Sequence, residues 1–422
     1  MKLAPPRGTR DFFPDDMRLR NWLFGHFRET ARLFAFEEYD APVLESEELY
    51  TRKAGEDIVK QLYNFEDKGG RAVALRPEMT PSLARMILQK GKSLALPVRW
   101  FSIPQCWRYE RMTRGRKREH YQWNMDVFGV PGVGAEAELL SAITTFFSRL
   151  GLQSTDVGIR VSSRKVLQGV VEAEGVPPER FTEVCVLVDK LDKLPRDAIE
   201  KDMNALGLSP ASVDRILDTL SLRSLDELAQ ALGDENEAVI ELRELFQLAE
   251  GYGCADWLQF DASVVRGLAY YTGVVFEAFD RQGSLRAICG GGRYDHLLST
   301  FGGKDIPACG FGFGDVVILE LLSDKGLIPE LEGGVDDVVF AFSEDLRGAA
   351  LQVASHLREA GRSVDLVLEA RKVKWAFRHA DRIGASRVVL LAPDEWARGE
   401  IRLKDLSTGE ETNIALDDLP TP

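Results

Sequence analysis

The sequence predicts an α/β protein with several domains, and three observations support this prediction. Glycine-rich stretches with short apolar segments at about 41–129 and 264–314 are typical of β-strands joined by turns. Residues 153–255 are rich in Asp, Glu, Leu and Ala in amphipathic patterns, which predicts a helical insertion. Strand and helix patterns alternate near the C-terminus, which indicates a separate α/β domain. We therefore expect one core made of 1–152 and 256–328, an insertion at 153–255, and a C-terminal domain at 335–422.

Apolar residues at three-to-four-residue spacing predict the individual helices. In the first of these, residues 16–40, Leu23 and Phe27 lie on the same expected face. Two further helices belong to the insertion, and others flank the strand-rich segments. Their expected ranges are 134–150, 225–232, 237–250 and about 315–325.

The C-terminal domain follows a glycine-containing linker at 330–334 and is expected to have a largely parallel sheet. Its second helix carries Lys374, Arg378 and Arg382 on one face, at positions i, i+4 and i+8. Such a basic face fits either an RNA-docking surface or an ordinary solvated helix, and the spacing does not distinguish them. The expected strands are 338–342, 364–368 and 388–391, and the expected helices are 346–360 and 373–383.

Composition excludes several classes of protein. No apolar run approaches the roughly 18 residues that a membrane span needs, and the first twenty residues lack the pattern of a secretory signal. The five cysteines are scattered and never spaced as CxxC, so neither a disulfide framework nor a zinc site is expected. This cysteine usage fits a cytoplasmic protein without membrane attachment.

The formal net charge of −14 argues against general nucleic-acid binding, because phosphate contacts need cations. Two local clusters depart from this average, at 108–118 and 371–387, where arginine and lysine far outnumber acids. An acidic protein with two basic clusters could bind a polyanion at those places only. Two solvated charge runs remain the alternative.

Residues 103–128 predict a β-hairpin with one polar and one apolar face. On the second arm Tyr121, Trp123, Met125 and Val127 alternate with polar residues, so the apolar set should face the core. The polar face would be costly to bury unless it lines a site. An ordinary surface hairpin with cross-strand ion pairs is the alternative. The residues expected together on the polar face are Arg108, Glu110, Gln122, Asn124 and Asp126.

The same hairpin resembles a known motif. Trp107–Arg111, Gly115–Glu119 and His120–Trp123 look like motif 2 of class II aminoacyl-tRNA synthetases, and in detail resemble the histidine-specific branch. Other matching segments follow in that family's order. They are Arg7–Pro14, Phe36–Glu45 (motif 1), Leu75–Thr80, Val265–Gly273, Val275–Glu277 and Cys289–Asp295. The ordered set is similar to the histidyl-tRNA synthetase family, and to its plant-organellar branch.

This resemblance implies a fold, an activity and partners. The core would be a class II synthetase core, with a mixed, mainly antiparallel sheet flanked by helices, and the C-terminal domain would bind the anticodon. The activity would be that of a histidine–tRNA ligase acting on ATP, L-histidine and tRNA-His, with Mg²⁺ accompanying ATP and no tightly bound protein metal. The family also implies a homodimer.

The resemblance also implies roles for individual residues. Arg108 and Arg266 would be catalytic, stabilising charge at the α-phosphate. ATP would be bound by Arg108, Glu110 and Arg116, and RNA by Arg116, Lys374 and Arg378. Histidine would be bound by Glu78, Thr80, Gln122, Asp126, Arg266, Tyr270 and Tyr271.

One departure from the family pattern concerns ATP. Motif 3 usually ends with an arginine near the γ-phosphate, and this sequence has Val317 at that position. Arg85 and the arginines of the 108–118 loop are candidate substitutes. The main alternative function is a non-catalytic, synthetase-like regulatory subunit of histidine biosynthesis, although such proteins usually lack the RNA-binding domain and the catalytic arginines.

Overall fold

The computed structural model describes residues 3–51, 59–177, 180–188, 195–264, 270–331 and 333–419. The chain forms two compact units, one made mainly of residues 20–328 and one mainly of 329–422. Within the described residues no helix is long and apolar enough to cross a membrane. All five cysteines are buried.

A large, mainly antiparallel sheet forms the centre of the first unit. Among the strand pairs that the structure describes in this sheet, only β1–β5 and β8–β9 are parallel. A short strand, β6 (Gln105–Trp107), also pairs with β7. The strand order is β1 (Glu37–Glu38), β5 (Val98–Ser102), β7 (Glu119–Phe128), β12 (Ala308–Gly314), β11 (Cys289–Arg293), β10 (Val274–Asp280), β8 (Val157–Ser163) and β9 (Leu258–Phe260).

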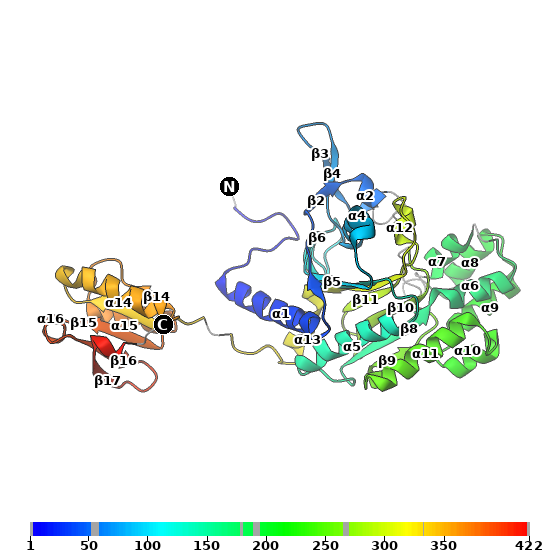
Figure 1. Cartoon of the computed structure of the whole chain (residues 1–422). Helices are drawn as coiled ribbons and strands as arrows, with labels where there is room; N and C mark the ends of the chain where they lie inside the picture. Colours follow the sequence, from blue (N-terminus) through cyan, green and yellow to red (C-terminus); the bar gives the residue numbers. More distant parts are fainter. Residues whose placement is uncertain are drawn as a thin grey trace. The chain divides into compact units, whose positions relative to one another are not determined.

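Helices cover one face of this sheet and bury its apolar residues. Leu23 and Phe27 of the first helix pack in one core with residues of the sheet and of the helices labelled α5 and α13 (Figure 1). The first helix begins at Pro14 and ends at Leu33, so its predicted extent to residue 40 is wrong; Ala35 has a positive φ of 57°, which a continuing helix does not allow. These helices are α1 (Pro14–Leu33), α5 (Gly134–Arg149) and α13 (Asp315–Asp324).

The opposite face of the sheet carries a smaller apolar core around the helix α4. The N-terminus of this helix, at Thr80, borders the pocket described below. Beside it is a separate antiparallel sheet. The elements here are α4 (Thr80–Lys90), α2 (Glu48–Thr51), α12 (Leu297–Thr300), and the strands β2 (Leu44–Ser46), β4 (Ala72–Leu75) and β3 (Tyr63–Glu66).

The predicted insertion is mostly helical, but it also contains β8, which pairs with β10 in the main sheet. Its helical part therefore begins only at Arg164. Several of these helices share a core of their own, whereas α10 and α11 contribute to the main core. The described helices are α6 (Arg164–Ala173), α7 (Phe181–Val188), α8 (Arg196–Ala205), α9 (Pro210–Leu220), α10 (Leu225–Leu232) and α11 (Glu237–Gly251).

The second unit is a sheet with a helix on each face. Val339 packs with residues of α14, whereas Val338 and Phe340 pack with residues of α15. The predicted parallel strands are confirmed, but two further antiparallel strands extend the sheet, so it is mixed. The elements are β13 (Asp337–Ala341), α14 (Arg347–Glu359), β14 (Val364–Leu366), α15 (Val373–Arg382), β15 (Arg387–Leu391), α16 (Pro393–Trp396), β16 (Glu400–Asp405) and β17 (Glu411–Ala415).

Candidate active site

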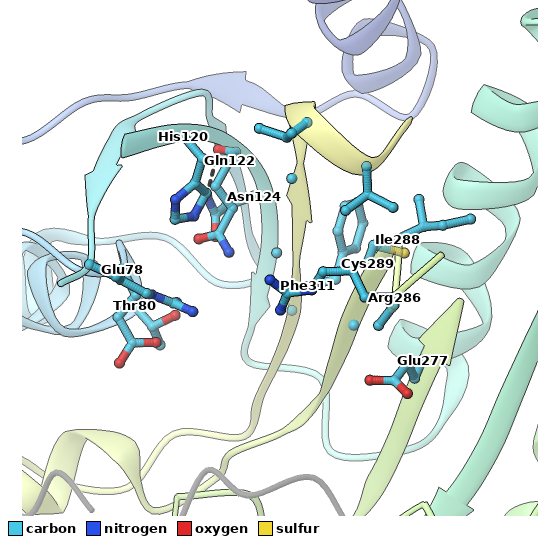
Figure 2. A pocket seen from close by; sticks show the side chains of 18 of the residues that line it. Glu78, Thr80, His120, Gln122, Asn124, Glu277, Arg286, Ile288, Cys289 and Phe311 are labelled. Carbon is cyan, nitrogen blue, oxygen red and sulfur yellow. Dashed lines mark hydrogen bonds between the residues drawn. The ribbon is translucent and has the colours of Figure 1, made fainter. Parts of the chain in front are cut away.

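An open pocket lies on the polar side of β7. Its empty volume is ≈ 1200 Å³, including the part that is open to solvent. Strands β11 and β12 and the first residues of α4 and α13 complete its wall. Figure 2 shows Glu78 and Thr80 on one side of this pocket and Glu277 on the other. Arg266 lies outside the described residues. The other residues predicted for this site all line the pocket: Glu78, Thr80, Arg108, Glu110, Arg116, Gln122, Asp126, Tyr270 and Tyr271.

The predicted hairpin brings these residues together. Strands β6 and β7 pair in antiparallel register, with Cys106 opposite His120. Along β7, Trp123 and Met125 are fully buried in the helix-covered core, so the alternate residues face the pocket, as period-two geometry requires. Strand β6 ends at Trp107, and Arg108 and Glu110 therefore follow the strand rather than belonging to it.

Glycines on the neighbouring strand β12 make room for the polar side chains of β7. Gly310 lies opposite Asp126 and Gly312 opposite Gln122. A Cβ atom added to Gly310 would lie 2.2 Å from Asp126 Oδ1, and one added to Gly312 would lie 2.5 Å from Gln122 Nε2. Both distances are far below van der Waals contact, so these positions admit only glycine while the two side chains keep their places.

One end of the pocket combines buried carboxyl groups with tyrosines. The Tyr270 hydroxyl donates a hydrogen bond to Glu78 Oε2 at 3.2 Å, and the Tyr294 hydroxyl donates one to Asp126 Oδ1. Burial raises the pKa of Asp126 to about 7 and also raises the pKa of Glu78, although Arg108 opposes the second shift. The rings of Tyr270 and Tyr271 lie 5.0 Å apart between centroids. This end can accept hydrogen bonds from a small cationic or polar molecule.

The other end of the pocket is rich in guanidinium groups. Arg108 Nε donates a hydrogen bond to the Pro77 carbonyl at 2.9 Å, and Arg116 Nε lies 2.8 Å from Glu110 Oε2. Burial lowers the pKa of His120 to about 3, with a further contribution from the nearby arginines, so its imidazole is neutral at physiological pH. This end therefore presents fixed positive charge, which suits phosphate oxygens.

An N-terminal arginine holds the start of β7 in place. Arg10 Nε lies 2.7 Å from Glu119 Oε1, and its terminal nitrogen lies 3.0 Å from Asp315 Oδ2. Asp315 also accepts a hydrogen bond from the backbone N–H of Tyr121 at 2.9 Å. Burial raises the pKa of Asp315 to about 6, and Arg10 opposes that shift. These contacts join the N-terminal segment, β7 and α13 behind the pocket.

The pocket residues that were not among the predicted site residues include Glu277, Arg286 and Tyr294. Glu277 and Tyr294 lie inside segments that resemble the family, so their motifs were a usable signal. Arg286 precedes the glycine strand by a few residues and carried no such signal.

The structure does not support Arg85 as a replacement for the arginine missing at position 317. Arg85 binds Glu45 at 2.6 Å and does not line the pocket. Of the loop arginines, Arg114 binds Glu320 and Asp324 of α13. Arg116 does line the pocket.

The basic helix face predicted in the second unit is present on α15. Lys374 and Arg378 are exposed, whereas Ala376 and Ala380 on the opposite side are fully buried. Arg382 donates a hydrogen bond to His379 Nδ1 at 2.8 Å, and His379 Nε2 lies 2.6 Å from Asp365 Oδ2. The amphipathic helix is thus confirmed, while its partner is not defined by these contacts.

A mainly antiparallel sheet, flanked by helices and carrying an arginine- and carboxylate-lined pocket on the motif 2 hairpin, defines the core of a class II aminoacyl-tRNA synthetase. Family models agree with this class: residues 8–314 match the histidyl-tRNA synthetase model, and residues 336–421 match an anticodon-binding domain. The chain therefore belongs to the histidyl-tRNA synthetase family.

Individual relatives agree with this assignment. The chain is 59% identical to the chloroplastic/mitochondrial histidine–tRNA ligase of Arabidopsis thaliana, over 98% of this chain and 85% of the relative. It is 42% identical to the histidine–tRNA ligase of Opitutus terrae, over 96% and 94% of the two chains. The crystal structure of histidyl-tRNA synthetase from Nostoc sp. PCC 7120 is similar with a TM-score of 0.78, at 26% identity and covering 99% and 98% of the chains.

Proposed function

We propose that this protein is a histidine–tRNA ligase that uses ATP. In the first step a carboxylate oxygen of L-histidine attacks the α-phosphorus of ATP, and the bond to the leaving pyrophosphate breaks. In the second step the 3′-terminal ribose hydroxyl of tRNA-His attacks the carbonyl carbon of the histidyl-adenylate, and AMP leaves. The observation that supports this proposal most directly is a pocket with carboxyl and tyrosine groups at one end and arginines at the other.

Within this proposal, histidine binds at the end of the pocket that holds the buried carboxyl groups. Glu78, Gln122 and Asp126 are acceptors for the α-ammonium group and for an imidazole N–H, and Tyr270 and Tyr271 border the ring. A pocket whose buried acceptors stay unpaired with an apolar analogue rejects that analogue by a large factor. Thr80 opens helix α4 beside Glu78 and completes this end.

The cationic end binds ATP. Arg108 stabilises the negative charge that develops at the α-phosphate, and its hydrogen bond to Pro77 fixes its position in advance. Glu110 and Arg116 form a pair that can contact the adenine side and the outer phosphates. Arg266 keeps its proposed role opposite Arg108 on the basis of family resemblance alone.

Metal, assembly and location are further parts of the proposal. Magnesium is proposed as the ion that accompanies ATP, and Glu110 and Glu277 are the pocket carboxylates able to approach it. In the described part of the chain, no three His, Cys, Asp or Glu side chains gather where they could hold a metal ion of their own. A homodimer and a cytoplasmic location remain predictions.

RNA contacts are proposed at two places. Arg116 would reach the 3′ end of the tRNA, while Lys374 and Arg378 on α15 would contact phosphates near the anticodon. Exposed cations on a helix suit backbone phosphates, which position an RNA without reading its sequence. The anticodon-binding domain match over residues 336–421 supports this assignment.

Pyrophosphate exchange tests the proposal directly. The purified protein should incorporate labelled pyrophosphate into ATP with histidine and not with the other amino acids. It should also charge tRNA-His. A regulatory subunit without catalysis would show neither activity, so the absence of histidine-dependent exchange would overturn the proposal.

A further inference from the structure

We propose that Arg286 binds the outer phosphates of ATP, and so supplies the positive charge that a valine at position 317 cannot. This inference rests on the proposed ligase function and adds a substrate-binding residue to it. Three observations support it: Arg286 lines the pocket, other charged residues of the pocket lie near it, and Arg286 forms no ion pair among the described residues.

Arg286 and Val317 both lie against Gly115 of the motif 2 loop. Arg286 precedes β11 in the β10–β11 hairpin and lines the pocket (Figure 2). A Cβ atom added to Gly115 would lie 3.3 Å from Val317 Cγ2 and 3.6 Å from Arg286 Cγ. The stem of Arg286 and the side chain of Val317 therefore both pack near this loop glycine, and both residues line the pocket. A guanidinium group on this stem can serve the same region of the pocket as a side chain from position 317.

The charges around Arg286 favour an anionic ligand. Burial lowers the pKa of Arg286, and the nearby charges of Arg116 and Arg108 lower it further, while Glu110 and Glu277 oppose the shift. Arg116 already has Glu110 as its partner at 2.8 Å. No described carboxylate forms an ion pair with Arg286. Three guanidinium groups facing one pocket repel each other, and a polyphosphate would remove that repulsion.

The outer phosphates are a better assignment than the α-phosphate or the amino acid. Arg108 is the arginine that acts on Glu78 at the histidine end, where its charge opposes the rise in that carboxyl pKa. Arg286 instead lies near Gly115, the loop glycine that Val317 also approaches. A guanidinium offers forked donors that match two phosphate oxygens. A guanidinium group at this position would stabilise the charge of the departing pyrophosphate during activation.

Equilibrium binding of ATP and AMP to the full-length protein provides the sharpest test. Arg286→Ala should weaken ATP binding about 10- to 100-fold, which corresponds to one lost charge-assisted hydrogen-bonding group. AMP binding and the KM for histidine should change little, because neither involves the outer phosphates. Arg286→Lys should recover part of the loss, since lysine keeps the charge but not the fork.

Arg281→Ala is the matched control, because Arg281 lies in the same hairpin and its Nε donates to the Ser154 carbonyl at 2.6 Å rather than facing the pocket. This variant should bind ATP as the unmodified protein does. Unchanged ATP binding in Arg286→Ala, or equal losses for ATP and AMP, would overturn the assignment. Failure of the ligase proposal is distinguishable, because the unmodified protein would then show no histidine-dependent exchange.

Discussion

The pocket of the first unit and the α15 face of the second unit both collect basic side chains, but they hold them in different ways. Arg108 is partly buried and is held by the carbonyl of Pro77, a residue 31 positions away in sequence. Lys374 and Arg378 are exposed, and their spacing on one helix is enough to align them. A charge held by tertiary contacts suits chemistry at one atom, whereas exposed charges suit adaptable binding to a phosphate backbone.

The largest expected effect concerns the support behind the pocket. Arg293 and Glu136 form a buried bidentate pair, with N–O distances of 2.6 Å and exposed fractions of 5% and 0%. Arg293→Ala leaves a buried carboxylate without its partner, so the free energy of unfolding should fall by about 3–5 kcal/mol. Urea denaturation measures this change. Arg28→Ala removes the exposed pair with Glu38 and should cost less than about 1 kcal/mol; equal costs would mean that burial does not decide the value of these pairs.

The second prediction concerns the catalytic end of the pocket. Arg108→Ala should lower the rate of histidine-dependent pyrophosphate exchange about 10²- to 10³-fold, because a preorganised donor at the α-phosphate is lost. Arg114→Ala is the control, since Arg114 belongs to the same loop but binds Glu320 and Asp324. A similar loss in both variants would point to loop structure instead of charge at the reacting phosphate.

The third prediction tests the exposed face of α15. Combined Lys374→Ala and Arg378→Ala changes should raise the KM for tRNA and leave pyrophosphate exchange unchanged. The slope of log affinity for tRNA against log salt should fall by about 2, one for each lost phosphate contact. Arg347→Ala, on the other helix of this unit and paired with Glu344, serves as control. An unchanged slope would mean that this face of α15 is an ordinary solvated helix surface that does not contact RNA.

The smallest expected effect is a pH dependence from Asp126, whose pKa of about 7 lies above the usual 3.8 because the group is buried. The native state keeps this proton while the unfolded chain releases it, so its contribution to stability falls as pH rises from about 4 to about 7. The affinity for histidine should rise as the pH increases toward about 7, by at most about tenfold per pH unit, because the ionised Asp126 carboxylate accepts an imidazole N–H. Asp126→Asn should remove this component from the KM profile; an identical profile in that variant would exclude Asp126 as its source.

Local patterns predicted much of the fold. The alternation along β7 separated Trp123 and Met125 from Gln122 and Asp126, and the spacing on α15 separated its buried alanines from its basic face. The end of α1 and the added strands β16 and β17 were missed. Tertiary pairing decided both. Residues of β1, which were predicted to continue the first helix, pair instead with β5, and β16 joins the sheet by pairing with β15.

The site shows the same division. Motif resemblance predicted nine of the residues that line the pocket, because those residues lie in or beside segments with a recognisable order. Arg286 was missed and Arg85 was wrongly considered, because neither choice follows from spacing. Only the tertiary structure distinguishes them, since it places Arg286 in the pocket and pairs Arg85 with Glu45.

The sequence by itself determined the class of the fold, the family and the residue types of the site, because periodicity and ordered motifs are properties of neighbouring residues. The tertiary structure decided which side chains share the pocket, which arginines are already paired, and which carboxyl groups lose their water. These depend on distances between segments far apart in the chain, and on desolvation, which no local pattern records.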